Sequence, residues 1–120
     1  MHISHVSLSE SIQIIEEAKK DGKGRITCEV TPHHLLLDEA SKGPHGLPLT
    51  VNPPLRKKED CTVLQRAIKG GTIDVIASDH APHREEDKRA GAPGLIGLET
   101  TLGVVLTRLI HPGLISLREA

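Results

Sequence analysis

The sequence of 120 residues contains no phenylalanine, tyrosine or tryptophan. Proteins that bind single-stranded nucleic acid stack the bases on such rings, so this mode of recognition is excluded. The 15 Lys and Arg residues nearly balance the 16 Asp and Glu residues, which gives a net charge of -1 with neutral histidine. Such a balance does not favour a phosphate backbone as ligand, and we expect no nucleic-acid partner.

Cysteine and long apolar runs are also scarce. Cys28 and Cys61 are the two cysteines, too few for a disulfide scaffold. We expect both to be buried free thiols in a reducing compartment, which makes the chain cytoplasmic. No apolar run reaches the roughly 20 residues of a membrane span, so no membrane partner is expected. The residue in excess is histidine, with eight copies, and these residues are the first candidates for a functional role.

Hydrophobic periodicity predicts strands that alternate with helices. A capping box of Ser7 and Glu10 indicates a helix start, and the run 21–24 indicates its end. The predicted strands are residues 2–6, 25–31 and 73–77, and the other predicted helical segments are residues 35–37, 57–69 and 97–110. Long loops are predicted at residues 41–54 and 80–94. The third strand is nearly all apolar, which is typical of a parallel strand covered on both faces.

This order of elements indicates an α/β fold with a parallel sheet. Three strands alone leave two sheet edges without partners. A complete (β/α)8 barrel takes about 250 residues, roughly twice this length. We therefore interpret residues 1–120 as a single incomplete domain, a partial (β/α)8 barrel of the TIM type with about three parallel strands and their helices.

Two candidate functional residues lie where predicted strands end. His5 closes the first strand and Asp79 directly follows the third. These strands are about 10 Å apart in a parallel sheet, so side chains that lean inward can reach one metal ion. The alternative is structural, with a hydrogen-bonded histidine and a turn-forming aspartate. Residues an odd number apart on a strand face opposite sides, so we expect His2 to point away from His5.

The remaining histidines have a less specific context. His33 and His34 follow a proline and are adjacent, so we expect one to be buried and the other to face solvent. His45 and His111 stand in loop or terminal segments and are expected at the surface.

Three loop features allow either a structural or a functional interpretation. Asn52 precedes two prolines that fix the backbone, so its amide either belongs to a stiff turn or binds a polar substrate. The charged run at residues 84–89 is interpreted as a solvated loop face. The Pro93-Gly94 step can present backbone N–H groups to an anion, because glycine permits a close approach.

Six segments carry a family resemblance. They are His5-Val6-Ser7, Cys28 to Leu35, Asn52-Pro53-Pro54-Leu55-Arg56, Gly71 to Asp74, Ser78-Asp79-His80-Ala81-Pro82-His83 and Gly97 to Thr100. In this order and at this spacing they closely resemble the class I dihydroorotases, which are amidohydrolase-superfamily enzymes of pyrimidine biosynthesis. The pairing of Asp-His-Ala-Pro-His with Asn-Pro-Pro-Leu-Arg is specific, because the related hydantoinases and allantoinases carry other residues there.

The resemblance implies a role for particular residues of barrel strands six to eight, in the C-terminal part of the catalytic barrel. It implies that His5 is the strand-six zinc ligand and that Asp79, after strand eight, both contacts metal and acts as general acid and base. It implies that Asn52 and His83 contact substrate, with His83 at the substrate carboxylate. The backbone of Pro93 and Gly94 resembles the loop that also touches substrate.

The same resemblance implies a reaction and a cofactor. The reaction is the reversible conversion of N-carbamoyl-L-aspartate to dihydroorotate at a binuclear Zn2+ centre. The family's N-terminal metal ligands are absent from this chain, which retains His5 and Asp79, so we expect weak zinc binding by the chain alone. Expected partners are the small-molecule substrate and either self-association or a chain that supplies the missing barrel half. The alternatives are a non-catalytic dihydroorotase-like assembly partner and another cyclic amidohydrolase of the allantoinase or hydantoinase type.

Overall fold

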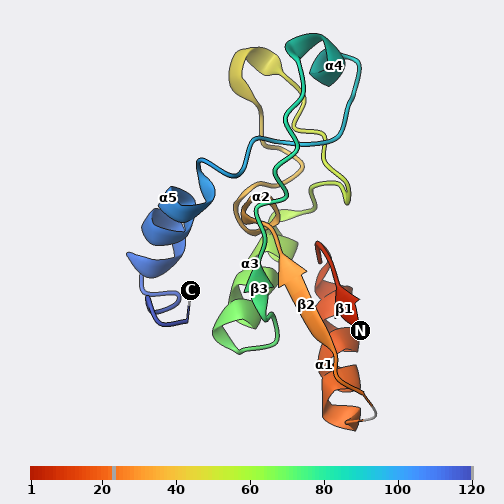
Figure 1. Cartoon of the computed structure of the whole chain (residues 1–120), viewed down its shortest axis with the longest axis vertical. Helices are drawn as coiled ribbons and strands as arrows, with labels where there is room; N and C mark the ends of the chain where they lie inside the picture. The colour runs from red at the N-terminus through yellow and green to blue at the C-terminus, as the bar shows by residue number, and fades with distance from the viewer. Residues whose placement is uncertain (23, 120) are drawn as a thin grey trace.

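A three-stranded parallel sheet lies at the centre of the computed structural model, which describes residues 1–22 and 24–119 (Figure 1). The strands follow the order β1-β2-β3, and their bounds are His2–Ile3, Thr27–Val30 and Val75–Ile76. His2 pairs with Thr27, and Glu29 pairs with Val75. The predicted alternation of strands and helices and the parallel sheet are confirmed.

Short helices connect and follow these strands. They are α1 (Ser9–Asp21), α2 (Pro32–Leu36), the 3-10 turn η1 (Pro44–Gly46), α3 (Lys58–Lys69), α4 (Glu85–Arg89), α5 (Thr101–Val105) and the π-helical turn η2 (Leu106–Ile110). The arrows of β1 and β2 point toward the end of the molecule that carries α4 (Figure 1). The predicted last helix begins at Thr101 rather than residue 97, because Gly97 to Thr100 form a turn. None of the described helices is long and apolar enough to cross a membrane.

The core is aliphatic, as the composition requires. Val30 on β2, Leu35 on α2 and Leu64 on α3 are fully buried. Cys28 and Cys61 are buried free thiols, as predicted, and burial raises the pKa of both. Together with Ile12 and Ile15 of α1, the three aliphatic side chains form one core cluster that fastens α1, α2 and α3 to the sheet.

The first strand is shorter than the sequence predicts. It ends at Ile3, and His5 has a φ of +53°, in the left-handed region. The expectation that His2 and His5 face opposite sides is wrong, because it assumed a continuous strand. The Glu29 carboxylate lies 3.0 Å from both His2 Nε2 and His5 Nδ1, so both imidazoles meet one side chain.

The predicted capping box at the start of α1 does not form. The helix begins at Ser9 without a cap from its own N-cap side chain. Asp60, on α3, accepts the Ser9 N–H at 2.9 Å instead, and the Ser7 hydroxyl accepts from Arg56 Nε at 3.2 Å. A tertiary contact therefore replaces the local one. Gly22 ends the helix at a φ of +66°, as predicted, while Lys23 of the stop signal lies outside the described residues.

Two predictions about exposure need correction. The charged run at residues 84–89 is exposed at five of its six residues, as predicted, but most of it forms α4 rather than a loop, and Lys88 is only 8% exposed. The third strand is not covered on both faces either, because Val75 is 46% exposed. β3 is the last strand of the sheet, so its outer edge has no strand beside it among residues 1–22 and 24–119.

Candidate active site

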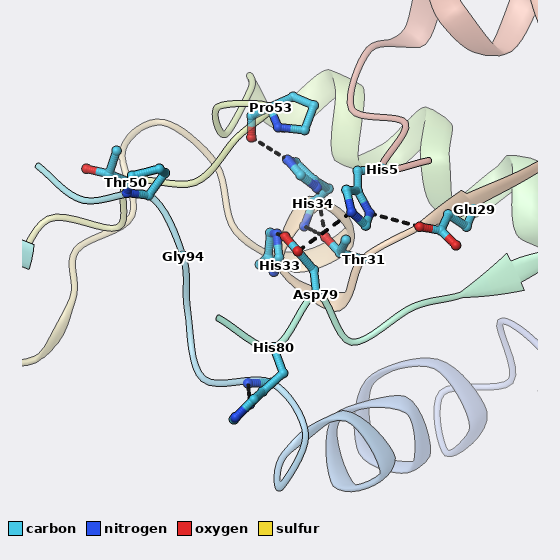
Figure 2. Close-up of polar contacts among 12 residues, drawn as sticks. His5, Glu29, Thr31, His33, His34, Thr50, Pro53, Asp79, His80 and Gly94 are labelled. Carbon is cyan, nitrogen blue, oxygen red and sulfur yellow. Dashed lines mark hydrogen bonds and ion pairs between the residues drawn. The ribbon is translucent and has the colours of Figure 1, made fainter. Parts of the chain in front are cut away.

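His5 and Asp79 come together beyond the carboxyl ends of the strands (Figure 2). His5 Nε2 lies 3.6 Å from Asp79 Oδ1, and His33 Nε2 lies 3.6 Å from Asp79 Oδ2. His5 and Asp79 both adopt positive φ values, +53° and +46°. Such conformations are uncommon outside glycine and persist where the surrounding structure holds them, often at functional sites. The geometry gathers two imidazoles around one carboxylate.

The two adjacent histidines after Pro32 are both buried. His33 is 7% exposed and His34 is 2% exposed, so the prediction that one faces solvent is wrong. It assumed side chains that point apart, as on a strand, whereas both residues lie in α2 with ring centroids 4.6 Å apart. His45 and His111 are exposed, as predicted.

His34 joins the end of β2 to the Asn52-Pro53 segment. Its Nε2 lies 2.9 Å from the Pro53 carbonyl oxygen, and its Nδ1 lies 2.7 Å from Thr31 Oγ1. A carbonyl can only accept, so Nε2 carries the proton and Nδ1 accepts the Thr31 hydroxyl proton. Thr31 Oγ1 in turn accepts the His34 N–H and caps α2. The whole arrangement suits a neutral imidazole.

Burial keeps both buried imidazoles neutral near pH 7. Desolvation, helped by His34 and His5, lowers the pKa of His33 to about 4. Desolvation also lowers the pKa of His34, although the Pro53 carbonyl opposes the shift. His33 Nε2 is buried without a hydrogen-bond partner among the described residues and faces Asp79.

The donor atoms of His5 and Asp79 fit part of a zinc site. Zinc ligands at about 2.0–2.2 Å in tetrahedral geometry lie roughly 3.3–3.6 Å from each other, and the two donor atoms here are 3.6 Å apart. Imidazole and carboxylate are also ligands that zinc accepts. Among residues 1–22 and 24–119, however, no group of three or more His, Cys, Asp or Glu side chains could hold a metal ion. The pair is therefore a partial donor set.

The predicted substrate-contacting residues lie on two loops that touch each other. Asn52 and His83 are exposed. His83 Nε2 lies 2.9 Å from the Pro93 carbonyl oxygen, and the Gly94 N–H donates to the Thr50 carbonyl at 2.9 Å. The structure thus groups His83, Pro93 and Gly94, and connects them to the loop that carries Asn52.

Glycine is required at position 94. The φ of Gly94 is +142°, and a Cβ there would lie 2.5 Å from the Ala81 carbonyl oxygen. The loop after α4 can therefore lie close to the Asp-His-Ala-Pro-His segment only with glycine at this point.

The sequence interpretation did not single out Glu29 or Lys88. Glu29 contacts His2 and His5, and its signal was a charged residue inside a short, otherwise uncharged strand. Lys88 was hidden in a run of charged residues, and no sequence feature distinguished it from its exposed neighbours.

In three dimensions the chain is similar to solved cyclic amide hydrolases. An L-hydantoinase (dihydropyrimidinase) from Arthrobacter aurescens matches with a TM-score of 0.86 and 31% identity. A dihydropyrimidinase from Brevibacillus agri matches with a TM-score of 0.85 and 28% identity. Each match covers 98% of this chain and 28% of the solved one. The fold prediction is confirmed: an α/β chain with three parallel strands, matching part of TIM-barrel amidohydrolases.

In sequence the chain is similar to dihydroorotases. The dihydroorotase of Mycobacterium tuberculosis is 45% identical over 99% of the chain, and that of Shouchella clausii is 47% identical over 98%. The chain spans 28% of the length of these relatives. No protein-family model matches the sequence. The resemblance to dihydroorotases is confirmed, whereas the roles of individual residues, the single incomplete domain and the partners stay predictions.

Proposed function

We propose that this chain forms one part of a dihydroorotase active site and contributes His5 and Asp79 to it. In the complete enzyme the reaction is the reversible conversion of N-carbamoyl-L-aspartate to dihydroorotate. The observation that supports the proposal is the 3.6 Å approach of His5 Nε2 to Asp79 Oδ1, between residues 74 positions apart (79 − 5). Sequence identity of 42–47% to dihydroorotases supports the choice of reaction.

Zinc is the cofactor that we propose for this site. His5 Nε2 and Asp79 Oδ1 would hold it from this chain, and residues outside the chain would complete the donor set. When bound, the metal polarises the scissile amide carbonyl and lowers the pKa of water, which supplies a nucleophile near neutral pH.

Asp79 is the group that we propose to move the proton. In the hydrolytic direction its carboxylate takes a proton from the attacking water and delivers it to the departing amide nitrogen. In the biosynthetic direction the same carboxylate takes the proton from the attacking nitrogen and returns it to the carboxyl oxygen, which departs as water when the C–N bond forms. His33 lies beside it but stays neutral, because burial lowers its pKa to about 4. The His33 imidazole therefore adds no positive charge next to the Asp79 carboxylate at pH 7.

Substrate orientation is the role proposed for the two loops. The Asn52 amide offers both a donor and an acceptor to the ring edge. His83 donates Nε2–H to the Pro93 carbonyl at 2.9 Å, and this bond orients the ring that we assign to the substrate carboxylate. Fixing the substrate in this way provides the orientation that a ring closure requires.

A chimeric enzyme tests this function. In this chimera the 120-residue chain replaces the matching segment of the Mycobacterium tuberculosis dihydroorotase. We expect formation of N-carbamoylaspartate from dihydroorotate, at a rate well above that of the relative from which the matching segment has been deleted. A folded chimera without this activity contradicts the proposal and favours the non-catalytic assembly partner.

Hydantoinase-type activity is the second candidate, and the structural matches favour it. Solved hydantoinases superimpose with TM-scores of 0.83–0.86, although their identities are only 24–31%. Hydantoin and dihydrouracil are therefore offered to the chimera beside dihydroorotate. We expect the highest kcat/KM for dihydroorotate, because its carboxylate matches the proposed role of His83. A preference for hydantoin or dihydrouracil would contradict dihydroorotase activity and support hydantoinase-type activity instead.

A further inference from the structure

Lys88 is a buried cation that the proposed mechanism does not use. The residue is 8% exposed, although its neighbours on α4 are exposed. Its ammonium donates to three backbone carbonyls, those of Thr50 at 2.9 Å, Ala92 at 2.9 Å and Gly94 at 2.8 Å. An ammonium has three N–H donors, so these carbonyls use all of them.

The acceptors of Lys88 belong to two separate loops. Thr50 lies on the loop that carries Asn52, whereas Ala92 and Gly94 lie on the loop after α4. The Thr50 carbonyl also accepts the Gly94 N–H at 2.9 Å. In Figure 2 the loop near Gly94 passes beside Thr50, where these bonds join the two segments. One side chain therefore connects two parts of the chain that are 42 residues apart (92 − 50).

A pocket lies between the connected loops. Its volume is about 440 Å3, and its lining includes Leu49, His83, Lys88 and Gly94. Lys88 and Gly94 both line it, so the hydrogen bond from the Lys88 ammonium to the Gly94 carbonyl joins two residues of its wall. The size is typical of sites for small molecules.

Stability alone is a poor reason for this arrangement. A buried cation is costly unless it is well hydrogen-bonded, and no carboxylate of the described residues forms an ion pair with this one. An apolar side chain of the same length would fill the same space without burying a charge, but it would leave these three carbonyls without the Lys88 donors. The ammonium instead holds three carbonyl oxygens at 2.8–2.9 Å from one atom, which orients the two loops relative to each other.

We propose that Lys88 is a positioning residue that clamps the loop of Pro93 and Gly94 to the loop of Asn52. By holding Gly94 against Thr50, the clamp fixes one wall of the pocket that His83 lines, and His83 is the residue proposed to meet the substrate carboxylate. This inference rests on the proposed function for its ligand, but the clamp itself is a property of the loops.

Hydrogen exchange of the 120-residue chain tests the clamp without any assay of activity. The variant Lys88→Met keeps the length of the side chain and removes its N–H donors. We expect the Gly94 amide to exchange about 10-fold faster, while the Leu64 amide of α3 exchanges at the original rate. Arg89→Met is the matched control, because it removes one positive charge from the exposed side of the same helix, and it should leave the Gly94 amide unchanged. Unchanged Gly94 exchange in Lys88→Met, or equal loss of protection at Leu64, contradicts the clamp.

Steady-state kinetics of the chimeric enzyme test the consequence for substrate. In Lys88→Met we expect KM for dihydroorotate to rise about 10-fold and kcat to change by less than about 3-fold, because Lys88 touches neither His5 nor Asp79. Lys88→Arg keeps the charge and the donors and should recover part of the lost KM. A fall in kcat at constant KM, or an equal loss in Lys88→Arg, contradicts a positioning role.

The two experiments also separate this inference from the proposed function. If the unmodified chimera does not turn over dihydroorotate, the proposed function fails. The exchange rates of Gly94 then still decide whether Lys88 clamps the loops.

Discussion

His5 and Asp79 reach each other because the backbone turns sharply at both residues. Each has a positive φ where a parallel strand has just ended, at +53° and +46°. A continued strand would carry the following side chains to alternate faces of the sheet. The turn instead brings His5 Nε2 to within 3.6 Å of Asp79 Oδ1. At the scale of single residues, two local conformations make the candidate metal site.

The substitution Asp79→Asn tests the proton-transfer role in the chimeric enzyme. The amide keeps the shape of the side chain but cannot accept a proton from water, so we expect kcat for dihydroorotate to fall by about 10^2- to 10^4-fold. Asp87→Asn is the matched control, because it makes the same change at an exposed position on α4. Nearly intact turnover in Asp79→Asn would show that another group moves the proton.

The buried His34 makes stability depend on pH. Its pKa is lowered in the folded chain, so between that value and the ordinary value near 6.5 the unfolded chain binds more protons. The free energy of unfolding therefore falls as the pH drops from 7 to 5. Urea denaturation at both pH values measures this change.

His34→Gln should reduce that pH dependence, because glutamine cannot titrate, while the buried His33, whose pKa is also lowered, still contributes to it. The matched control is His45→Gln, at an exposed histidine, which should leave the dependence as it is. An equal slope in the original chain and in His34→Gln would show that other groups cause the pH dependence.

At the scale of elements, contacts between helices replace the expected local caps. The start of α1 depends on Asp60, which α3 presents to the Ser9 N–H at 2.9 Å. Burial by itself would raise the pKa of Asp60, but the hydrogen bonds from Ser9 and Lys57 and the nearby charge of Arg56 together outweigh it and lower the pKa. The carboxylate is thus more stable as an anion in the folded chain, next to the positive end of the α1 dipole.

The substitution Asp60→Ala tests this tertiary cap. It leaves the first N–H of α1 without its acceptor, and we expect a loss of about 1 kcal/mol in the free energy of unfolding at pH 7. Glu59→Ala changes an exposed carboxylate in the same turn of α3 and should cost much less. Chemical denaturation of the three chains gives the comparison. Equal stabilities of the two variants would contradict the cap.

The pattern of elements was predictable, whereas the contacts between distant residues were not. The apolar spacing of residues 57–69 predicts a helix, and the glycine at position 22 predicts the end of the helix before it. Both predictions depend on local sequence and are confirmed. The capping box of Ser7 failed because Asp60, 51 residues from Ser9, offered a better-placed acceptor. The burial of Lys88 also depends on carbonyls of another loop. Such positions are set by tertiary packing, which overrides local preference.

The candidate site was predictable to the extent that its residues mark strand ends. His5 and Asp79 follow β1 and β3, and parallel strands place their carboxyl ends together. The role of Glu29 beside His5 was not predictable in this way, because it required the turn at His5. The proposed reaction came from the sequence motifs, because the placement of His5 and Asp79 at strand ends is also compatible with purely structural roles.

At the scale of the whole molecule, apolar surface remains exposed beside the sheet. Leu102 and Leu117 are 70% and 73% exposed, and both line a pocket with Ile76, on the last strand. Exposed patches of this kind commonly mark contact sites between chains. The chain also spans only 28% of the length of the dihydroorotases that it matches. We propose that this face is covered in the complete enzyme by the rest of the barrel.

The isolated 120-residue chain should therefore self-associate through this face. Sedimentation velocity at several concentrations should show dimers or larger species, and Leu102→Asp should shift them toward monomer because a buried charge opposes the contact. Ile14→Asp is the matched control, since Ile14 is 67% exposed on α1, outside this pocket. A monomer that unfolds cooperatively at all concentrations would contradict the expectation of an incomplete barrel.

The most direct test of the account is the position of the metal in crystals of the chimeric enzyme grown with zinc. Anomalous scattering at the zinc edge locates the ion without any assumption about activity. We expect a peak at about 2.0–2.2 Å from both His5 Nε2 and the Asp79 carboxylate. A peak that touches neither side chain, in an enzyme that turns over dihydroorotate, would contradict the central claim that these two residues share one metal ion.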